Sequence, residues 1–445
     1  MNAACEQKSD EKSYLCVGFL NCLLISALIV KYDIMKIKKG ILKLSFVAAL
    51  VFVATYSCKK EDSAKTYSYF VSKKLVVEFK KDYITSMLNL ASIQIPEVVG
   101  IKSRVISDIS VYKIVYKTTI NGKEINASGL ICVPVTSGDY PVLSFQNGTN
   151  TVYSAAPSAS PSDYTHQLIE SIASMGYVVL FADYPGFGES TQIPHPYLVK
   201  EPTVRSLVDL LYTAKEIGSS EFPGITFRNE YYLLGYSQGG WATFALDKAL
   251  ESDYASDFNV KGASCGAGSY NIPQLLESML NQQTYPVPAY MAYIVNAYIA
   301  YNQFTNPASD FFNSPYASKI SSLFDGTLSL DQIDAQLTTS IPDLLNPDFV
   351  SGFGTSPRYS SVKTALSNNS ITAWHTSVPV LFTHGEKDTE VNPVSTENIF
   401  NEMIAAGTSP DICKKITVPN VDHGPGAIPC LINGLLFIDN IKNSK

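Results

Sequence analysis

The sequence predicts an α/β fold with a mostly parallel central sheet, helices on both faces and an inserted helical cap. Short apolar runs that suit buried strands alternate with helical patterns, and this alternation favours parallel strands joined by helices. The alternation is interrupted over residues 269–376, which have helical patterns of their own, and then resumes. The chain has 445 residues, 46% of them hydrophobic, so it is long enough to bury a large core.

The first part of the core is expected over residues 111–268. It should begin with a hairpin of strands 111–119 and 125–134, joined through Asn121-Gly122, a dipeptide typical of tight hairpin turns. Residues 58–110, which precede the hairpin, are interpreted as a tether and a leading segment. After the hairpin, strands and helices are expected over residues 140–146, 163–175, 177–183, 202–217, 231–236, 238–251 and 259–266.

Residues 269–376 are interpreted as a cap or lid, and residues 377–445 as the second part of the core. In the second part, strands and helices are expected over residues 379–384, 394–406, 412–418 and 428–440. Tyrosines share one side of a predicted helix in the cap, at Tyr290, Tyr293, Tyr298 and Tyr301. They either pack the core of the cap or line an acyl pocket above the site.

The most informative segment of the chain is YYLLGYSQGG at residues 231–240, which indicates a buried strand ending in a tight turn at Ser237. Gly235 and Gly239 flank the serine in a G-x-S-x-G pattern, typical of a nucleophile elbow, where neighbouring backbones come too close for a Cβ atom. The helix expected after Ser237 would direct its N-terminal N–H groups at an oxyanion. The alternative is a glycine-rich turn in which the serine only caps the helix.

A nucleophilic serine needs a base and a carboxylate that orients the base. Of the five histidines, His423 follows a predicted strand in a glycine-rich loop and is the expected base. Asp388 lies just past a predicted strand, where α/β sheets place their sites, and is the expected acid, with Glu386 as the second choice. Asp422 is interpreted as a loop-capping residue. The other histidines are interpreted as packing, surface or pocket residues: His166, His195, His375 and His384.

Two loops complete the predicted site. The loop at Asn147-Gly148 follows the strand YPVLSFQ and should supply one oxyanion donor, through the backbone N–H of Thr149 or Gly148. The second donor is expected to be the backbone N–H of Gln238. In the other loop, FADYPGFGES at residues 181–190, Asp183 is expected to have a structural role near the site.

The order of the candidate residues, with serine first, then aspartate and then histidine, is the order found in α/β-hydrolases. The chain resembles the α/β-hydrolase superfamily, lipase/carboxylesterase type, and is similar to exported, lipid-anchored bacterial members. The resemblance covers about residues 112–441, and many relatives have His-Gly where this chain has Asn147-Gly148. The motifs that carry it are QNGT at 146–149, FADYPGFGES at 181–190, GYSQGG at 235–240, HGEKD at 384–388 and DHG at 422–424.

The resemblance implies a serine hydrolase that cleaves small-molecule or lipid carboxylic esters through an acyl-enzyme, without a cofactor. Ser237 would attack the carbonyl, His423 would transfer the proton and Asp388 would orient the histidine. Three alternatives stay open at this point. The same fold serves serine exopeptidases and carbohydrate esterases that remove acetyl or feruloyl groups, and a non-catalytic surface binding lipoprotein would retain the fold without turnover.

Residues 1–57 are interpreted as an export region. Lysines follow Met35, an apolar run covers residues 41–56, and a small residue precedes Cys58, as in a signal peptide that starts at Met35. Cys58 resembles the lipidated cysteine of bacterial lipoproteins, which implies attachment to the outer membrane through a lipid anchor. The competing interpretation is a membrane helix over residues 14–30.

The remaining composition excludes several classes of protein. The net charge is −7 and no basic stripe is present, so nucleic acid is not an expected partner. No C-x-x-C pair or His/Cys cluster indicates a metal.

Cys413 and Cys430 lie on either side of His423 and are candidates for a disulfide, whereas Cys132 and Cys265 are interpreted as buried thiols.

Overall fold

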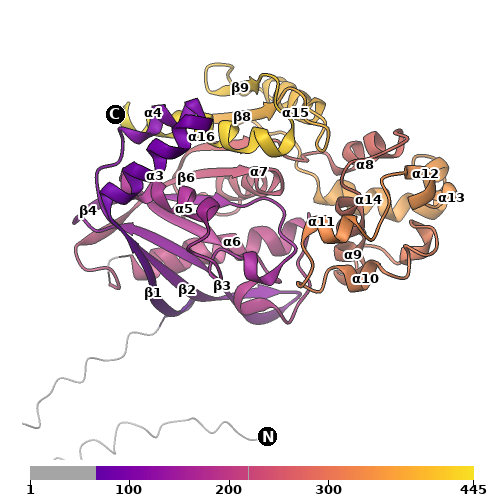
Figure 1. Cartoon of the computed structure of the whole chain (residues 1–445), viewed down its shortest axis with the longest axis horizontal. Coiled ribbons are helices and arrows are strands. Elements are labelled where there is room, and N and C mark those ends of the chain that lie inside the picture. The colour runs from indigo at the N-terminus through magenta and orange to yellow at the C-terminus, as the bar shows by residue number, and fades with distance from the viewer. Residues whose placement is uncertain (1–66, 219, 445) are drawn as a thin grey trace, which may run out of the picture. The chain divides into compact units, whose positions relative to one another are not determined.

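A nine-stranded sheet crosses the described part of the chain, residues 67–218 and 220–444 of a computed structural model (Figure 1). The strands are β1 (Phe70–Phe79), β2 (Ile109–Ile120), β3 (Lys123–Pro134), β4 (Gly138–Gln146), β5 (Val178–Ala182), β6 (Ile225–Tyr236), β7 (Val260–Gly266), β8 (Val380–Gly385) and β9 (Cys413–Val418). Their order in the sheet is β1-β2-β3-β5-β4-β6-β7-β8-β9. The pairs from β5 to β9 are parallel and the first three pairs are antiparallel, so the predicted mostly parallel sheet is confirmed.

Helices cover both faces of the sheet because its central strands have apolar side chains on both sides. The buried apolar side chains form two large clusters. In β4, Val142 belongs to the first cluster and its neighbour Leu143, on the other side of the strand, belongs to the second. Helices α6 (Lys200–Ile217) and α7 (Gln238–Glu251) contribute to the first cluster, and α16 (His423–Asn443) contributes to the second. Two further core helices are α5 (Tyr164–Glu170) and α15 (Val394–Ala405).

Part of the segment interpreted as a tether belongs to the sheet. Residues 70–102 form β1, α3 (Lys81–Gln94) and α4 (Val99–Lys102), and β1 pairs antiparallel with β2. Most side chains of β1 are exposed or half-buried because it is an edge strand, so it lacks the apolar run by which sequence analysis finds strands. Helix α3 buries Ile84 and Leu88 in the core.

Short helices fill the stretch between β7 and β8, and Figure 1 shows them grouped beyond α6 and α7. They are α8 (Ile272–Leu280), α9 (Ala289–Ala300), α10 (Ile320–Leu323), α11 (Leu330–Asp334), α12 (Ile341–Leu344), α13 (Pro347–Gly352) and α14 (Ser360–Asn369). We call residues 269–376 the helical insertion. The tyrosines of α9 are buried, among them Tyr293 and Tyr298.

Of the described helices, α16 alone is long and apolar enough to cross a membrane by length and composition. Ile432, Leu435 and Ile438 of α16 are buried in the core, so packing on the sheet accounts for its apolar character. The predicted signal peptide from Met35 and the candidate lipidation site Cys58 lie outside the described residues.

The disulfide considered between Cys413 and Cys430 is not formed, and within the described part of the chain both are free, buried thiols, as are Cys132 and Cys265. Cys413 is the first residue of β9, whereas Cys430 lies inside α16. Burial raises the pKa of Cys413 to about 11 and that of Cys430 to about 12, so both remain protonated thiols at neutral pH.

Candidate active site

Ser237 lies on the turn between β6 and α7, in a strained backbone conformation with φ 60° and ψ −123°. The glycines around it allow the close contacts of this turn. A Cβ on Gly239 would overlap the carbonyl oxygen of Gln146 in β4, and a Cβ on Gly235 would overlap the carbonyl oxygen of Gly239. The turn therefore holds the serine hydroxyl above the carboxyl end of the sheet.

The structure brings the three residues expected to react into one chain of hydrogen bonds. Nε2 of His423 lies 2.8 Å from Oγ of Ser237, and Nδ1 of His423 lies 2.6 Å from Oδ2 of Asp388. Since Nδ1–H donates to the carboxylate, Nε2 is left to accept the serine proton. Tyr236 donates its O–H to the main-chain oxygen of His423 at 2.7 Å and so helps to fix the histidine.

The loop after β8 positions Asp388, and the start of α16 positions His423. Oδ1 of Asp388 accepts the backbone N–H groups of Glu390 and Val391 at 3.0 and 2.8 Å, which leaves Oδ2 for the imidazole. Asp422 caps α16 by accepting the N–H of His423 at 2.8 Å. Glu386, the second choice for the acid, is exposed and accepts the N–H of Asn420 instead.

The charges in this cluster favour an ionised Asp388 beside a basic imidazole. Burial alone would raise the pKa of Asp388, but hydrogen bonds from His384 and His423 outweigh it and lower the pKa to about 2. Burial lowers the pKa of His423, but its hydrogen bond to Asp388 and the nearby negative charges outweigh burial and raise the pKa. The pair is thus arranged to stabilise a positive imidazolium.

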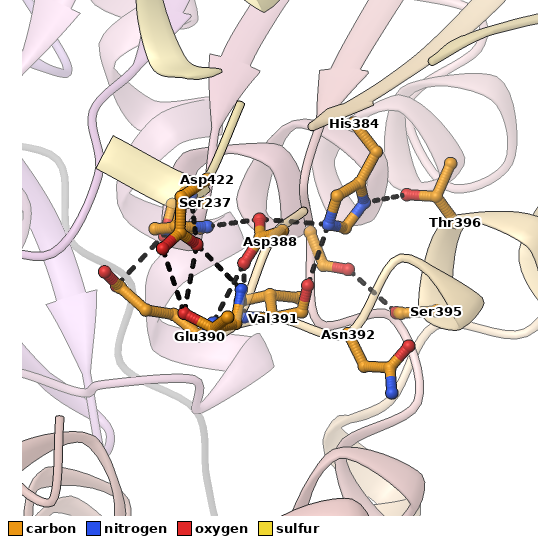
Figure 2. Close-up of polar contacts among 12 residues, drawn as sticks. Ser237, His384, Asp388, Glu390, Val391, Asn392, Ser395, Thr396 and Asp422 are labelled. Atoms are coloured by element: carbon orange, nitrogen blue, oxygen red, sulfur yellow. Dashed lines mark hydrogen bonds and ion pairs between the residues drawn. The ribbon is translucent and has the colours of Figure 1, made fainter. Parts of the chain in front are cut away.

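His384, which sequence analysis treated as a packing residue, contacts the acid directly (Figure 2). Its Nε2 lies 3.1 Å from Oδ2 of Asp388 and 2.8 Å from the carbonyl oxygen of Val391. Both partners are acceptors, so Nε2 carries the hydrogen, and Nδ1 accepts the O–H of Thr396 at 2.7 Å. The spacing of four residues in HGEKD was the available signal for this contact.

The loop expected to supply oxyanion donors passes against the nucleophile. A Cβ on Gly148 would lie 3.8 Å from Cβ of Ser237, and Thr149 pairs through its hydroxyl with Tyr197 at 2.9 Å. The side chain of Gln238 faces His195, with 2.8 Å between their Nε2 atoms.

His195 helps to fix this side of the site. Its Nδ1–H donates to the carbonyl oxygen of Pro185 at 2.8 Å, in the loop of residues 181–190, so its Nε2 accepts from Gln238. Burial lowers the pKa of His195 to about 4 and keeps the ring neutral. In the same loop, Asp183 accepts the N–H of Ser158 at 2.7 Å and makes no contact with the nucleophile.

The other histidines bind backbone oxygens away from Ser237. Nδ1 of His166 lies 2.8 Å from the oxygen of Ser160, and Nδ1 of His375 lies 3.0 Å from that of Gly407. Within residues 67–218 and 220–444, no group of three or more His, Cys, Asp or Glu side chains is arranged to hold a metal ion.

A narrow pocket with a cavity volume of about 10 Å³ lies beside Ser237, between the core loops and the helical insertion. Its apolar walls come mostly from the insertion, and its polar groups include one acidic side chain. The lining residues are Tyr197, Leu198, Ser237, Gln238, Ser269, Leu275, Met279, Tyr285, Tyr290, Ile294, Glu390 and Val391.

Comparison with known proteins assigns the chain to a family. The secretory lipase family model matches residues 155–409, more than half of the chain, and the chain belongs to this family. It is therefore an α/β-hydrolase of the lipase/carboxylesterase type, as predicted, and the family supports an exported hydrolase that acts on esters. No curated protein matches the chain.

Solved structures with the same fold come from bacteria and a yeast. A putative hydrolase from Legionella pneumophila is 23% identical, with a TM-score of 0.75, over 85% of this chain and 99% of its own. The rice cell wall degrading esterase LipA from Xanthomonas oryzae is 22% identical, with a TM-score of 0.70, over 83% of this chain and 97% of its own. Candida antarctica lipase A in its closed state is 16% identical, with a TM-score of 0.61, over 84% of this chain and 81% of its own.

Proposed function

We propose that the protein is a serine hydrolase that cleaves carboxylic esters through an acyl-enzyme, with Ser237, His423 and Asp388 as its triad. The observation that carries this proposal is the pair of contacts made by His423, at 2.8 Å to Oγ of Ser237 and 2.6 Å to Oδ2 of Asp388. These distances are within the hydrogen-bond reach that proton transfer between a nucleophile and its base requires.

In the first half of the reaction, Oγ of Ser237 attacks the ester carbonyl as His423 takes its proton at Nε2. Asp388 stabilises the imidazolium that forms. His423 then gives the proton to the leaving alcohol, and the acyl group remains on the serine. In the second half, His423 activates a water molecule that attacks the acyl-enzyme, and the carboxylic acid leaves.

The oxyanion would accept backbone N–H groups from two places. Gln238 is the first residue of α7, so its N–H has no partner within the helix and lies next to the nucleophile. The second donor would come from Gly148 or Thr149, whose loop contacts Ser237. Because these donors belong to the backbone, Asn147 in place of the usual histidine does not remove them.

The helical insertion would act as a cap that binds the acyl part of the substrate. Leu275, Met279 and Ile294 of the insertion line the pocket beside Ser237, which favours an apolar acyl group. Export through the segment that starts at Met35 and a lipid anchor at Cys58 would place the enzyme at the outer membrane, where ester lipids are available.

Replacement of the nucleophile tests the proposal. Ser237→Ala should abolish hydrolysis of p-nitrophenyl esters and labelling by a fluorophosphonate probe. Ser269→Ala is the matched control because Ser269 lines the same pocket without a hydrogen bond to His423. Ester hydrolysis by Ser237→Ala at a rate near that of the wild type would reject the proposal, as would a wild-type protein that neither turns over nor reacts with the probe.

A carbohydrate esterase is the second candidate, because the Xanthomonas oryzae structure with the same fold is named as a cell wall degrading esterase. It would use the same triad on acetyl or feruloyl groups of a plant polymer. Release of acetate from acetylated xylan at a kcat/KM above that for simple acetate esters would favour this candidate.

A further inference from the structure

Glu390 places a carboxylate in the substrate pocket, two residues after Asp388. Its side chain is 22% exposed and lines the pocket together with Ser237. Oε2 of Glu390 accepts the O–H of Tyr290 at 2.9 Å, and its main-chain oxygen accepts the O–H of Tyr285 at 2.8 Å. Two tyrosines of the helical insertion thus hold this residue of the core loop in one orientation.

The carboxylate of Glu390 has no permanent cation beside it. Among residues 67–218 and 220–444, no lysine or arginine forms an ion pair with Glu390, and the nearest basic group is the His423 ring at 4.0 Å, which is charged only when protonated. A mostly buried carboxylate is costly unless hydrogen bonds or a positive charge compensate it. Tyr290 supplies one hydrogen bond, and the carboxylate is otherwise available to a ligand that enters the pocket, because Glu390 lines it and is 22% exposed.

The position of Glu390 relates it to one part of the ester. Its Oε2 lies 4.0 Å from Nε2 of His423, the atom that returns the proton to the leaving alcohol oxygen. A carboxylate 4.0 Å from Nε2 is close to the position that the leaving alcohol oxygen would occupy. The same pocket is also lined by the apolar side chains of Leu275 and Met279, which would suit the acyl part.

We propose that Glu390 is a specificity-determining residue that binds an ammonium group on the alcohol part of the ester substrate. The inference rests on the proposed function, because it assumes that His423 protonates the leaving alcohol. Such a cation would compensate the buried carboxylate, and an alcohol with a carboxylate of its own would be repelled. The tyrosines of the insertion keep the carboxylate in place for this contact.

Two esters of the same shape test the charge preference. Choline butyrate carries a quaternary ammonium group on its alcohol, and 3,3-dimethylbutyl butyrate has a neutral carbon in the same position. We expect the wild-type enzyme to show a kcat/KM for the choline ester roughly tenfold above that for the neutral ester. Glu390→Gln should bring this ratio close to one. Because both esters are measured on the same variant, a general loss of activity lowers both kcat/KM values equally and leaves the ratio unchanged.

Glu386→Gln is the matched control. Glu386 lies on the same loop and carries the same charge, but it is exposed and bound to the N–H of Asn420. We expect this variant to keep the wild-type ratio, because its charge is screened by solvent and does not face the pocket. A ratio that falls equally in both variants would overturn the proposal, since it would reflect the overall field of the protein.

Two further outcomes would also overturn the proposal. One is a wild-type ratio near one, which decides the question even if Glu390→Gln does not fold. The other is a preference for a cation on the acyl part of the ester. It would appear as a higher kcat/KM for the ethyl ester of 4-(trimethylammonio)butyric acid than for ethyl 5,5-dimethylhexanoate, its neutral counterpart of the same shape. In both cases the proposed function stands as long as hydrolysis of the neutral ester depends on Ser237.

Discussion

Oδ2 of Asp388 lies 3.1 Å from Nε2 of His384 (Figure 2), and the same oxygen accepts Nδ1–H of His423 at 2.6 Å. The carboxylate of Asp388 is therefore held between two imidazole rings. The hydroxyl of Thr396 holds the outer ring at its Nδ1 atom, 2.7 Å away. This arrangement fixes the orientation of the carboxylate before any substrate is bound, and it makes His384 a positioning residue.

We expect His384→Leu to lower kcat with little change in KM. The lost hydrogen bond to a charged group is worth about 1.5–3 kcal/mol, which corresponds to a loss of kcat of roughly tenfold to a hundredfold. His384→Gln keeps an N–H donor and should recover part of the loss. Steady-state kinetics of both variants, with thermal melting as a control for folding, checks this. An equal loss of kcat in both variants would contradict the prediction, because it would show that the loss does not come from the hydrogen bond to Asp388.

The pH dependence of kcat/KM should reveal how nearby charges shift the pKa of His423. In the proposed mechanism, His423 accepts the serine proton only when its ring is neutral. Its pKa is raised above the usual 6.5, because the hydrogen bond to Asp388 and the charges of Asp388, Glu390 and Asp422 outweigh burial. We expect kcat/KM to fall as the pH drops through this raised pKa. Glu390→Gln removes one negative charge and should move the acid limb to lower pH. If the limb does not move, the carboxylate of Glu390 does not act on His423.

Ile294 should control the acyl chain length, because it lines two neighbouring spaces. One is the pocket beside Ser237, and the other is a small cavity of about 20 Å³ in the helical insertion, lined only by apolar side chains. Ile294→Trp should fill this region and reduce turnover of palmitate esters about tenfold more than that of acetate esters. A panel of p-nitrophenyl esters, with Ile294→Val as the conservative control, checks this. A uniform loss at all chain lengths would exclude the role.

Sequence patterns could place the core of this fold and the three residues expected to react, because both depend on local signals. The turn at Ser237 requires its glycines, and Asp388 lies just past an apolar strand. The strand β1 was missed because its exposed edge removes the apolar pattern. The contacts of Glu390 with Tyr285 and Tyr290 could not be predicted, because they join two segments about a hundred residues apart.

Gly239 should be the least replaceable glycine of the turn. Alanine is the better helix former, and Gly239 lies in the first turn of α7, so propensity alone would favour Gly239→Ala. Its Cβ would overlap the backbone oxygen of Gln146, however, so we expect a loss of about 1–3 kcal/mol in unfolding free energy and a severe loss of activity.

The control for this substitution is Gly148→Ala, whose Cβ would find only ordinary contacts, at 3.7 Å to the oxygen of Tyr236 and 3.8 Å to Ser237. We expect this variant to keep the wild-type unfolding free energy in urea titrations. Equal stability of the two variants would contradict the steric account of the turn.

Glu170 should make the fold sensitive to alkaline pH. The residue ends α5 and is buried, and neither oxygen of its carboxyl group has a hydrogen-bond partner among residues 67–218 and 220–444. Burial, with a smaller contribution from the charge of Asp163, raises the pKa of Glu170 from 4.5 to about 8. The folded state therefore favours the protonated form. Its contribution to stability is complete below about pH 4.5 and is lost as the pH rises through about 8.

We expect Glu170→Gln to remove this dependence, because the amide stays neutral at every pH. The variant and the wild type should unfold at similar temperatures at about pH 5, and the variant should be more stable by a few kcal/mol at about pH 9. Glu97→Gln is the control, since Glu97 is exposed and the substitution makes the same change in net charge. Melting curves at both pH values decide the matter: a Glu170→Gln protein that loses stability with pH as steeply as the wild type would show that this carboxyl group is not the source.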